Sequence, residues 1–139
     1  IRGSDRSGFL GKYPNEQVGG FALACCDADD RVGRDIACAA ARWYNGDNQA
    51  ELNPKRFATA GGLEAVVAKF RSRTNDELLE DGMAIGGNPD TVSRIVEKWA
   101  EAGLDQMIFI LQAGFTTQDQ IMRSIDLIGE KVIPRFATG

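Results

Sequence analysis

The stretch DGMAIGGNPDTVSRIVEKWAEAGLDQMIFILQAG, residues 81–114, contains two short apolar runs with a helix signal between them. Asn88 is a typical helix N-cap, and Pro89 follows at the first helical position, where its missing N–H costs no hydrogen bond. Gly103 is suited to end the helix because it can take a positive φ angle. The apolar residues in between recur at helical spacing and predict one buried stripe: Val92, Ile95, Val96 and Trp99.

The two apolar runs, Met83–Gly87 and Met107–Leu111, are of strand length and apolar at nearly every position. Strands that are apolar on both faces are typical of buried parallel sheets, and a helix that joins two of them forms a right-handed crossover. An antiparallel α+β piece is the alternative, but it would show alternating strands and hairpin turns. The stretch therefore predicts a strand, a helix and a parallel strand.

The same pattern recurs on both sides of this stretch. Upstream, the apolar run Gly19–Cys26 precedes the segment DADD, residues 27–30, whose three acidic side chains are suited to a helix start. Downstream, Thr117 and Gln120 form a plausible capping box for a last helix that stops near Pro134. The sequence predicts an α/β fold of three βα units, with strands near 19–25, 83–86 and 107–112, helices near 28–44, 89–102 and 118–130, and a further helix at 63–71. Residues 1–18 are predicted as an irregular leading segment, 19–139 as the βα units, and about 45–62 as a variable insertion.

Length and composition narrow the possible classes of protein. The 139 residues suit one domain and are too few for an α/β barrel, which takes about 250. A net charge of −4 gives no sign of nucleic-acid binding, and no apolar stretch reaches the ~20 residues that span a membrane. Three cysteines without metal-ligand spacing favour reduced thiols and a cytoplasmic location. Histidine is absent, so a mechanism that uses it must obtain it from another segment.

Two ordered motifs carry a resemblance to a known family. The run LLEDGMAIGGNPDTVSRIVEKWAEAGLDQMIFILQAG, residues 78–114, is followed by MRSIDLIGEKVIPRF, residues 122–136. Together they resemble the C-terminal end of the luciferase-like flavin-dependent monooxygenases, the bacterial luciferase superfamily. The upstream strand and helix, VGGFALACCDADD to RWY, resemble the preceding unit of that family more weakly.

This resemblance implies that the chain forms the last three βα units of a TIM-type barrel, which is incomplete here. It implies reduced FMN as cofactor, or a deazaflavin as in some branches, acting with O₂ on an organic substrate. In that family the catalytic histidine and most contacts to the flavin phosphate come from the earlier part of the barrel. The implied partner is therefore the missing N-terminal barrel segment or a partner chain, in a homo- or hetero-oligomer. Without it, the strands near 19–25 and 107–112 should have open edges.

Candidate site residues lie at the predicted C-terminal ends of the strands, where barrel enzymes hold their active groups. For cofactor binding the candidates are Gln112, Gly86 and Gly87. For a substrate pocket they are Cys25, Cys26 and Phe115. Each has a plain alternative: a hydrogen bond to backbone for Gln112, a tight βα turn for the glycine pair, and inert buried thiols for the cysteines. No nucleophile–base pair and no metal site is predicted.

Two functional hypotheses follow from the sequence. The first is a segment of a flavin-dependent luciferase-like oxidoreductase that forms barrel wall and pocket rim, and that is inactive as a lone chain. The second is a non-catalytic partner or truncated paralogue that acts as an assembly or binding module. Flavin binding distinguishes the two hypotheses.

Overall fold

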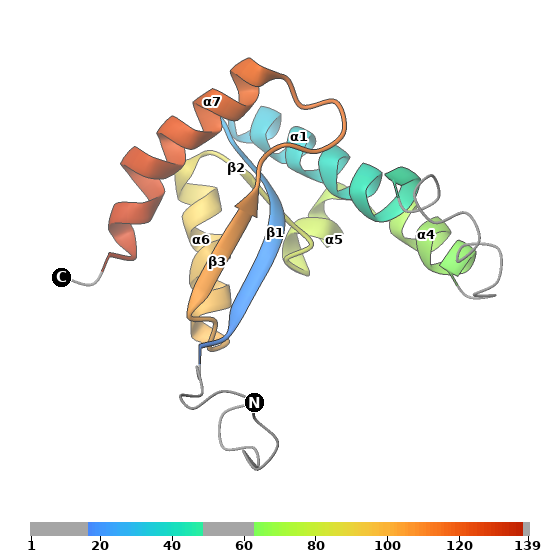
Figure 1. The fold of residues 1–139 in the computed structure, drawn as a ribbon, viewed down its shortest axis with the longest axis horizontal. Coiled ribbons are helices and arrows are strands. Elements are labelled where there is room, and N and C mark those ends of the chain that lie inside the picture. Colours follow the sequence, from blue (N-terminus) through green and yellow to red (C-terminus); the bar gives the residue numbers. More distant parts are fainter. Residues whose placement is uncertain (1–16, 49–62, 138–139) are drawn as a thin grey trace, which may run out of the picture.

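The computed structural model describes residues 17–48 and 63–137, and it contains a three-stranded parallel sheet (Figure 1). The strands are β1 (Gly19–Cys26), β2 (Ala84–Gly87) and β3 (Gln106–Ile110), in the spatial order β2-β1-β3. In register, Leu23 of β1 lies between Ala84 of β2 and Ile110 of β3. The predicted α/β class, with parallel strands and helical crossovers in an open sheet, is confirmed.

The position of β1 differs from what we expected. Instead of presenting an open edge, β1 pairs with β2 on one side and with β3 on the other, so the outer strands are β2 and β3. β1 is the longest strand, and its last five residues are all buried. A long, fully apolar strand gains most from neighbours on both edges, and this accounts for its central place.

Helix α1 (Asp30–Arg42) packs on β1 and β2 and continues into a π-helical turn, η1 (Trp43–Asp47). Its N-cap is Asp29, which accepts hydrogen bonds from two backbone N–H groups of the first turn. Glycines bring the helix close to β2. A Cβ atom at Gly33 would lie 2.5 Å from the Gly87 carbonyl oxygen, and one at Gly86 would lie 2.6 Å from the Cβ of Ala37. Side chains at these two positions would force the helix away from the sheet.

Helix α6 (Pro89–Glu101) joins β2 to β3 and has the ends that the sequence predicts. The Asn88 side chain accepts from the Thr91 N–H, and Gly103 takes a φ of +94° just after the helix. Val92 and Ile95 are buried as expected. Trp99 is only partly buried, because its indole packs against Gly82 at the rim of the core rather than within it.

The remaining helices are α4 (Leu63–Arg71), α5 (Asn75–Glu80) and α7 (Gln118–Leu127). α4 has its predicted bounds, whereas α5 was not predicted; its capping box joins Thr74 to Glu77. The predicted Thr117–Gln120 capping box of α7 is present. α7 continues into the turns η2 (Ile128–Val132) and η3 (Ile133–Arg135). Residues 1–16 and most of the expected insertion, 49–62, lie outside the described part of the chain.

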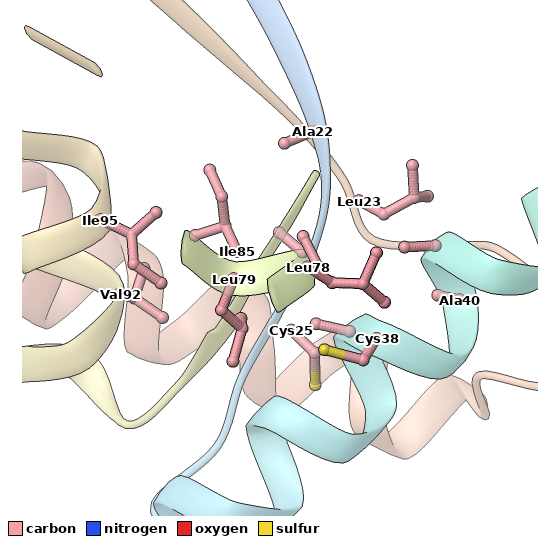
Figure 2. Packing of buried hydrophobic residues seen from close by; sticks show 14 of the residues in the cluster. Ala22, Leu23, Cys25, Cys38, Ala40, Leu78, Leu79, Ile85, Val92 and Ile95 are labelled. Carbon is pink, nitrogen blue, oxygen red and sulfur yellow. The ribbon is translucent and has the colours of Figure 1, made fainter. Parts of the chain in front are cut away.

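The hydrophobic core lies on both faces of the sheet (Figure 2). On one side Ile85 of β2 points toward Val92 and Ile95 of α6; on the other, Cys25 of β1 lies near Cys38 of α1. The two helices that flank β2 therefore cover opposite faces. Within the described ranges, no helix is long and apolar enough to cross a membrane.

Candidate functional site

The parallel strands bring their C-terminal ends to one edge of the sheet. The chain leaves β1 through α1 toward β2, while β3 lies on the other side of β1, so the direction of winding reverses between β1 and β3. In open α/β sheets, ligands bind at the carboxyl ends of the strands at such a reversal. The segment that follows β3, residues 111–117, leads over this point to α7. This end of the sheet is the candidate site.

A buried serine fixes α7 to the end of β1. Ser124 is 1% exposed, and its hydroxyl accepts from the Cys26 N–H at 3.0 Å and lies 2.9 Å from the Cys26 carbonyl oxygen. Next to it, the Arg123 Nε lies 3.4 Å from the Asp27 carboxylate. No motif in the sequence marks Ser124 as a site residue. Ser124 lies one helical turn from both Ile121 and Ile128, on the apolar face of α7, and this spacing could have indicated that it is buried.

The two glycines at the end of β2 are buried, and neighbouring polar groups satisfy the backbone around them. The Asp27 N–H donates to the Gly87 carbonyl oxygen at 3.0 Å, and the Asn88 N–H donates to the Asp30 carboxylate at 3.0 Å. A hydrogen bond with the Thr91 side chain is the main cause that lowers the pKa of Asp30, so its carboxylate is charged at neutral pH. These contacts describe a tight βα turn. A cofactor contact at Gly86 and Gly87 remains a prediction.

The cysteines at the end of β1 are buried thiols. Cys25 is 2% exposed and Cys26 is fully buried. Burial raises the pKa of Cys26 to about 11, and Cys25 and Asp27 act in the same direction. Burial also raises the pKa of Cys25, against the lowering effect of its hydrogen bond with Ser124. Both thiols are therefore protonated at neutral pH and are poor nucleophiles. Neither cysteine is among the described residues that line the nearest cavity, which lies between α1 and the segment after β3.

A cavity of about 280 Å³ lies between α1 and the segment from β3 to α7; we call it the α1–β3 cavity. Its walls are Asp35, Ile36, Ala39 and Ala40 from α1, and Ala113, Phe115, Thr116 and Gln120 from the other side. Of the predicted pocket residues, Phe115 lies here and is 93% exposed. Gln112 is exposed near the end of β3 but does not line the cavity.

Local contacts hold the segment above the α1–β3 cavity in place. The Thr116 hydroxyl donates to the Ala113 carbonyl oxygen at 2.8 Å and closes a turn in which Gly114 has a φ of +61°. A Cβ atom at Gly114 would lie 3.2 Å from the indole of Trp43, so the turn rests on the end of α1. Phe115 therefore projects from an ordered turn.

A second cavity, of about 400 Å³, lies between α6, β3 and the C-terminal turns; we call it the α6–β3 groove. Trp99, Met107, Phe109 and Ile133 are among its mainly apolar walls. It is the larger of the two cavities, but it includes Leu104–Gln106 at the start of β3. It therefore lies away from the C-terminal ends of the strands, where ligands bind in open α/β sheets. We therefore place the candidate site at the α1–β3 cavity.

The α1–β3 cavity is too small for a whole flavin-type cofactor. Pockets that hold drug-sized ligands measure about 300–1,000 Å³, so a cavity of 280 Å³ does not hold a flavin-type ring together with its phosphate tail. Among the described residues that line it, none is Lys or Arg, so they offer no anchor for a phosphate. Among all the residues that the structure describes, no group of three or more acidic, Cys or His residues is arranged to hold a metal ion.

The fold has a counterpart among solved structures. The coenzyme F420-dependent tetrahydromethanopterin reductase from Methanopyrus kandleri resembles 87% of this chain, with a TM-score of 0.51 and 19% sequence identity. The matched part is 36% of the reductase, so this chain spans about a third of its length. That protein has the TIM-barrel fold. The sequence matches no protein-family description and no curated protein.

Proposed function

We propose that this chain is the C-terminal segment of a flavin- or deazaflavin-dependent oxidoreductase of the luciferase-like type. The observation that carries the proposal is the fold likeness to a coenzyme F420-dependent reductase over 87% of the chain. It supports the resemblance found independently in the motifs from Leu78 to Phe136. In the assembled protein this segment forms one side of the site at the strand ends.

A deazaflavin of the F420 type is favoured over FMN, because the reductase with the similar fold is named for that coenzyme. When bound, such a cofactor supplies the redox chemistry, and the protein supplies binding, orientation and exclusion of water. This sequence has no histidine, so any histidine comes from the proposed N-terminal barrel segment or a partner chain. The same source supplies the phosphate anchor, because the described residues that line the cavity include no Lys or Arg.

Cofactor titration tests the proposal. The chain alone is titrated into F420 and, separately, into FMN, and cofactor fluorescence is followed; the titrations are repeated with a polypeptide that includes the N-terminal barrel units. We expect weak or no binding by the lone chain, tight binding by the assembled protein, and a preference for F420. Absence of binding by the assembled protein would favour the non-catalytic partner hypothesis instead. Stoichiometric tight binding by the lone chain would point to a self-sufficient oligomer.

Two glutamines provide a matched pair for this titration. Gln112 and Gln106 are both exposed, but Gln112 follows the C-terminal end of β3 and Gln106 begins the strand. In the assembled protein, Gln112→Ala should weaken cofactor binding about 2- to 12-fold, which is the equivalent of one hydrogen bond. Gln106→Ala should leave the affinity unchanged. Equal effects of the two substitutions would remove Gln112 from the site.

A further inference from the structure

We propose that the α1–β3 cavity binds a flat aromatic ring that is neutral or positively charged, and that the substrate of the oxidoreductase carries such a ring. The assignment of the ring to a substrate rests on the proposed function. The preference of the cavity itself rests on its size, its walls and its charge.

The walls of the cavity favour a flat apolar group. Ala39, Ala40 and Ala113 line it with small side chains, and Ile36 adds a larger apolar surface. Ala40 and Ala113 are buried, so they form the floor, whereas Ala39 is exposed near the opening. Small side chains on opposite walls leave a space that a planar ring can enter. At about 280 Å³ the cavity has room for two fused rings and little more.

Phe115 supplies an aromatic surface at the opening. It is 93% exposed, more than any other large apolar residue among those described, although the turn that carries it is fixed by Thr116 and by contact with Trp43. An aromatic side chain held in water beside an apolar cavity has a ring face free to stack. Stacked or edge-to-face contact with a bound ring would cover this surface.

The charges around the cavity decide which rings it accepts. Asp35 is the one charged residue among the described residues that line it, and its carboxylate accepts a hydrogen bond from the Asn75 side chain at 2.8 Å. Thr116 and Gln120 add neutral polar groups. The face of the Phe115 ring is electron-rich and attracts cations. An anionic ligand would meet the Asp35 carboxylate with no Lys or Arg among the described lining residues to offset it, so the cavity should reject it.

Three ligands with the same two-ring size test this preference: N-methylquinolinium, quinoline and 1-naphthalenesulfonate, at a pH where quinoline is neutral. Each is titrated into ¹⁵N-labelled chain, and amide chemical shifts are recorded. We expect N-methylquinolinium and quinoline to shift the amides of Ala39, Ala113 and Thr116. We expect 1-naphthalenesulfonate to bind at least tenfold more weakly at this site.

Two substitutions, each with a matched control, assign the effect to the cavity. Phe115→Leu should weaken binding of both accepted ligands at least fivefold, whereas Phe21→Leu, at another exposed phenylalanine, should not. Asp35→Asn should remove the advantage of the cation over the neutral ring. Asp126→Asn makes the same change in net charge on α7, outside the cavity lining, and should keep that advantage.

Some outcomes would overturn the proposal. These are equal binding of the anion, shifts confined to the α6–β3 groove, or affinities that do not respond to Phe115→Leu. If the assembled protein binds F420 while this cavity binds none of the rings, the ring site is wrong and the proposed function stands. If the rings bind as expected and the assembled protein binds neither F420 nor FMN, the ring site stands and the proposed function fails.

Discussion

The two outer strands of the sheet have opposite surroundings. All four residues of β2 are buried, between α1 on one face and α6 on the other. None of the five residues of β3 is fully buried, and Ile108 is 53% exposed; in Figure 1, α6 lies behind β3 and no labelled helix lies in front of it. Both faces of β2 are covered by helices of this chain, whereas the β3 side has apolar surface that the described residues do not cover.

The residues of the two strands explain this difference. β2 reads AIGG, and its glycines let α1 approach until backbones almost touch. β3 reads QMIFI, with four large apolar side chains and no charge. An uncharged outer strand with large apolar side chains is an unprotected edge. A further strand, from another segment or a second chain, could pair at this edge, as the proposed function requires.

The largest difference between the two sides should appear when one isoleucine on each is truncated. Ile85 of β2 is fully buried and Ile108 of β3 is half exposed. Ile85→Ala should lower the free energy of unfolding by about 2–5 kcal/mol, and Ile108→Ala by less than about 1 kcal/mol. Urea unfolding of both variants measures this. Similar losses would mean that a second copy or another segment already covers β3 in solution.

A smaller difference in the free energy of unfolding should appear between Gly→Ala substitutions at two glycines in helical segments. Helix propensity alone predicts that Gly→Ala stabilises by up to about 1 kcal/mol. At Gly33, however, the new methyl would collide with the backbone of Gly87, so we expect Gly33→Ala to destabilise by about 1–3 kcal/mol. At Gly129, in η2, a methyl group would meet no atom within 4 Å, so Gly129→Ala should be neutral or stabilising. Urea unfolding of the two variants measures both changes. A gain at Gly33 would show that α1 packs less tightly on β2 than these contacts imply.

The smallest effect concerns the carboxylate that links α1 to the start of α6 on the β2 side. The folded pKa of Asp30 is lowered, first by the Thr91 hydrogen bond and also by the Asn88 N–H. Its stabilisation is therefore present above the unfolded pKa of about 4 and is lost as the pH falls through the lower folded pKa. Because Asp30 is partly exposed, Asp30→Asn should cost only about 1 kcal/mol at pH 6.5.

Unfolding of the two proteins at pH 6.5 and pH 3 checks this prediction. The difference between wild type and Asp30→Asn should shrink at the lower pH, because protonation removes the same charge from the wild-type side chain. A difference that is constant with pH would show that the Asp30 charge does not contribute to stability.

Much of the fold was predictable because its signals are local. Asn88-Pro89, Thr117 with Gln120, and Gly103 mark helix ends through contacts within a few residues, and each lies where the sequence predicts. The apolar runs predicted the strands and their parallel direction. Helix α5 was missed because its six residues are too few to show a helical period, although the pair Thr74 and Glu77 was a usable signal.

The candidate site was less predictable because it depends on contacts distant in sequence. Phe115 could be proposed from its place after an apolar strand, but the opposite wall of its cavity comes from α1, about 80 residues earlier, as the contacts of Asp35 and Ala39 illustrate. The link from Ser124 to Cys26 spans 98 positions. No local pattern reports such pairs.

Hydrophobic periodicity and capping residues, which act over one or two turns of chain, were enough to establish the three βα units and their order. The central place of β1 was decided only in the tertiary structure, because strand order depends on which edges find partners after the units have formed. The same holds for the glycine contact between α1 and β2, and for the uncovered side of β3. These features arise from packing between segments far apart in sequence, and a pattern read along the chain does not contain that information.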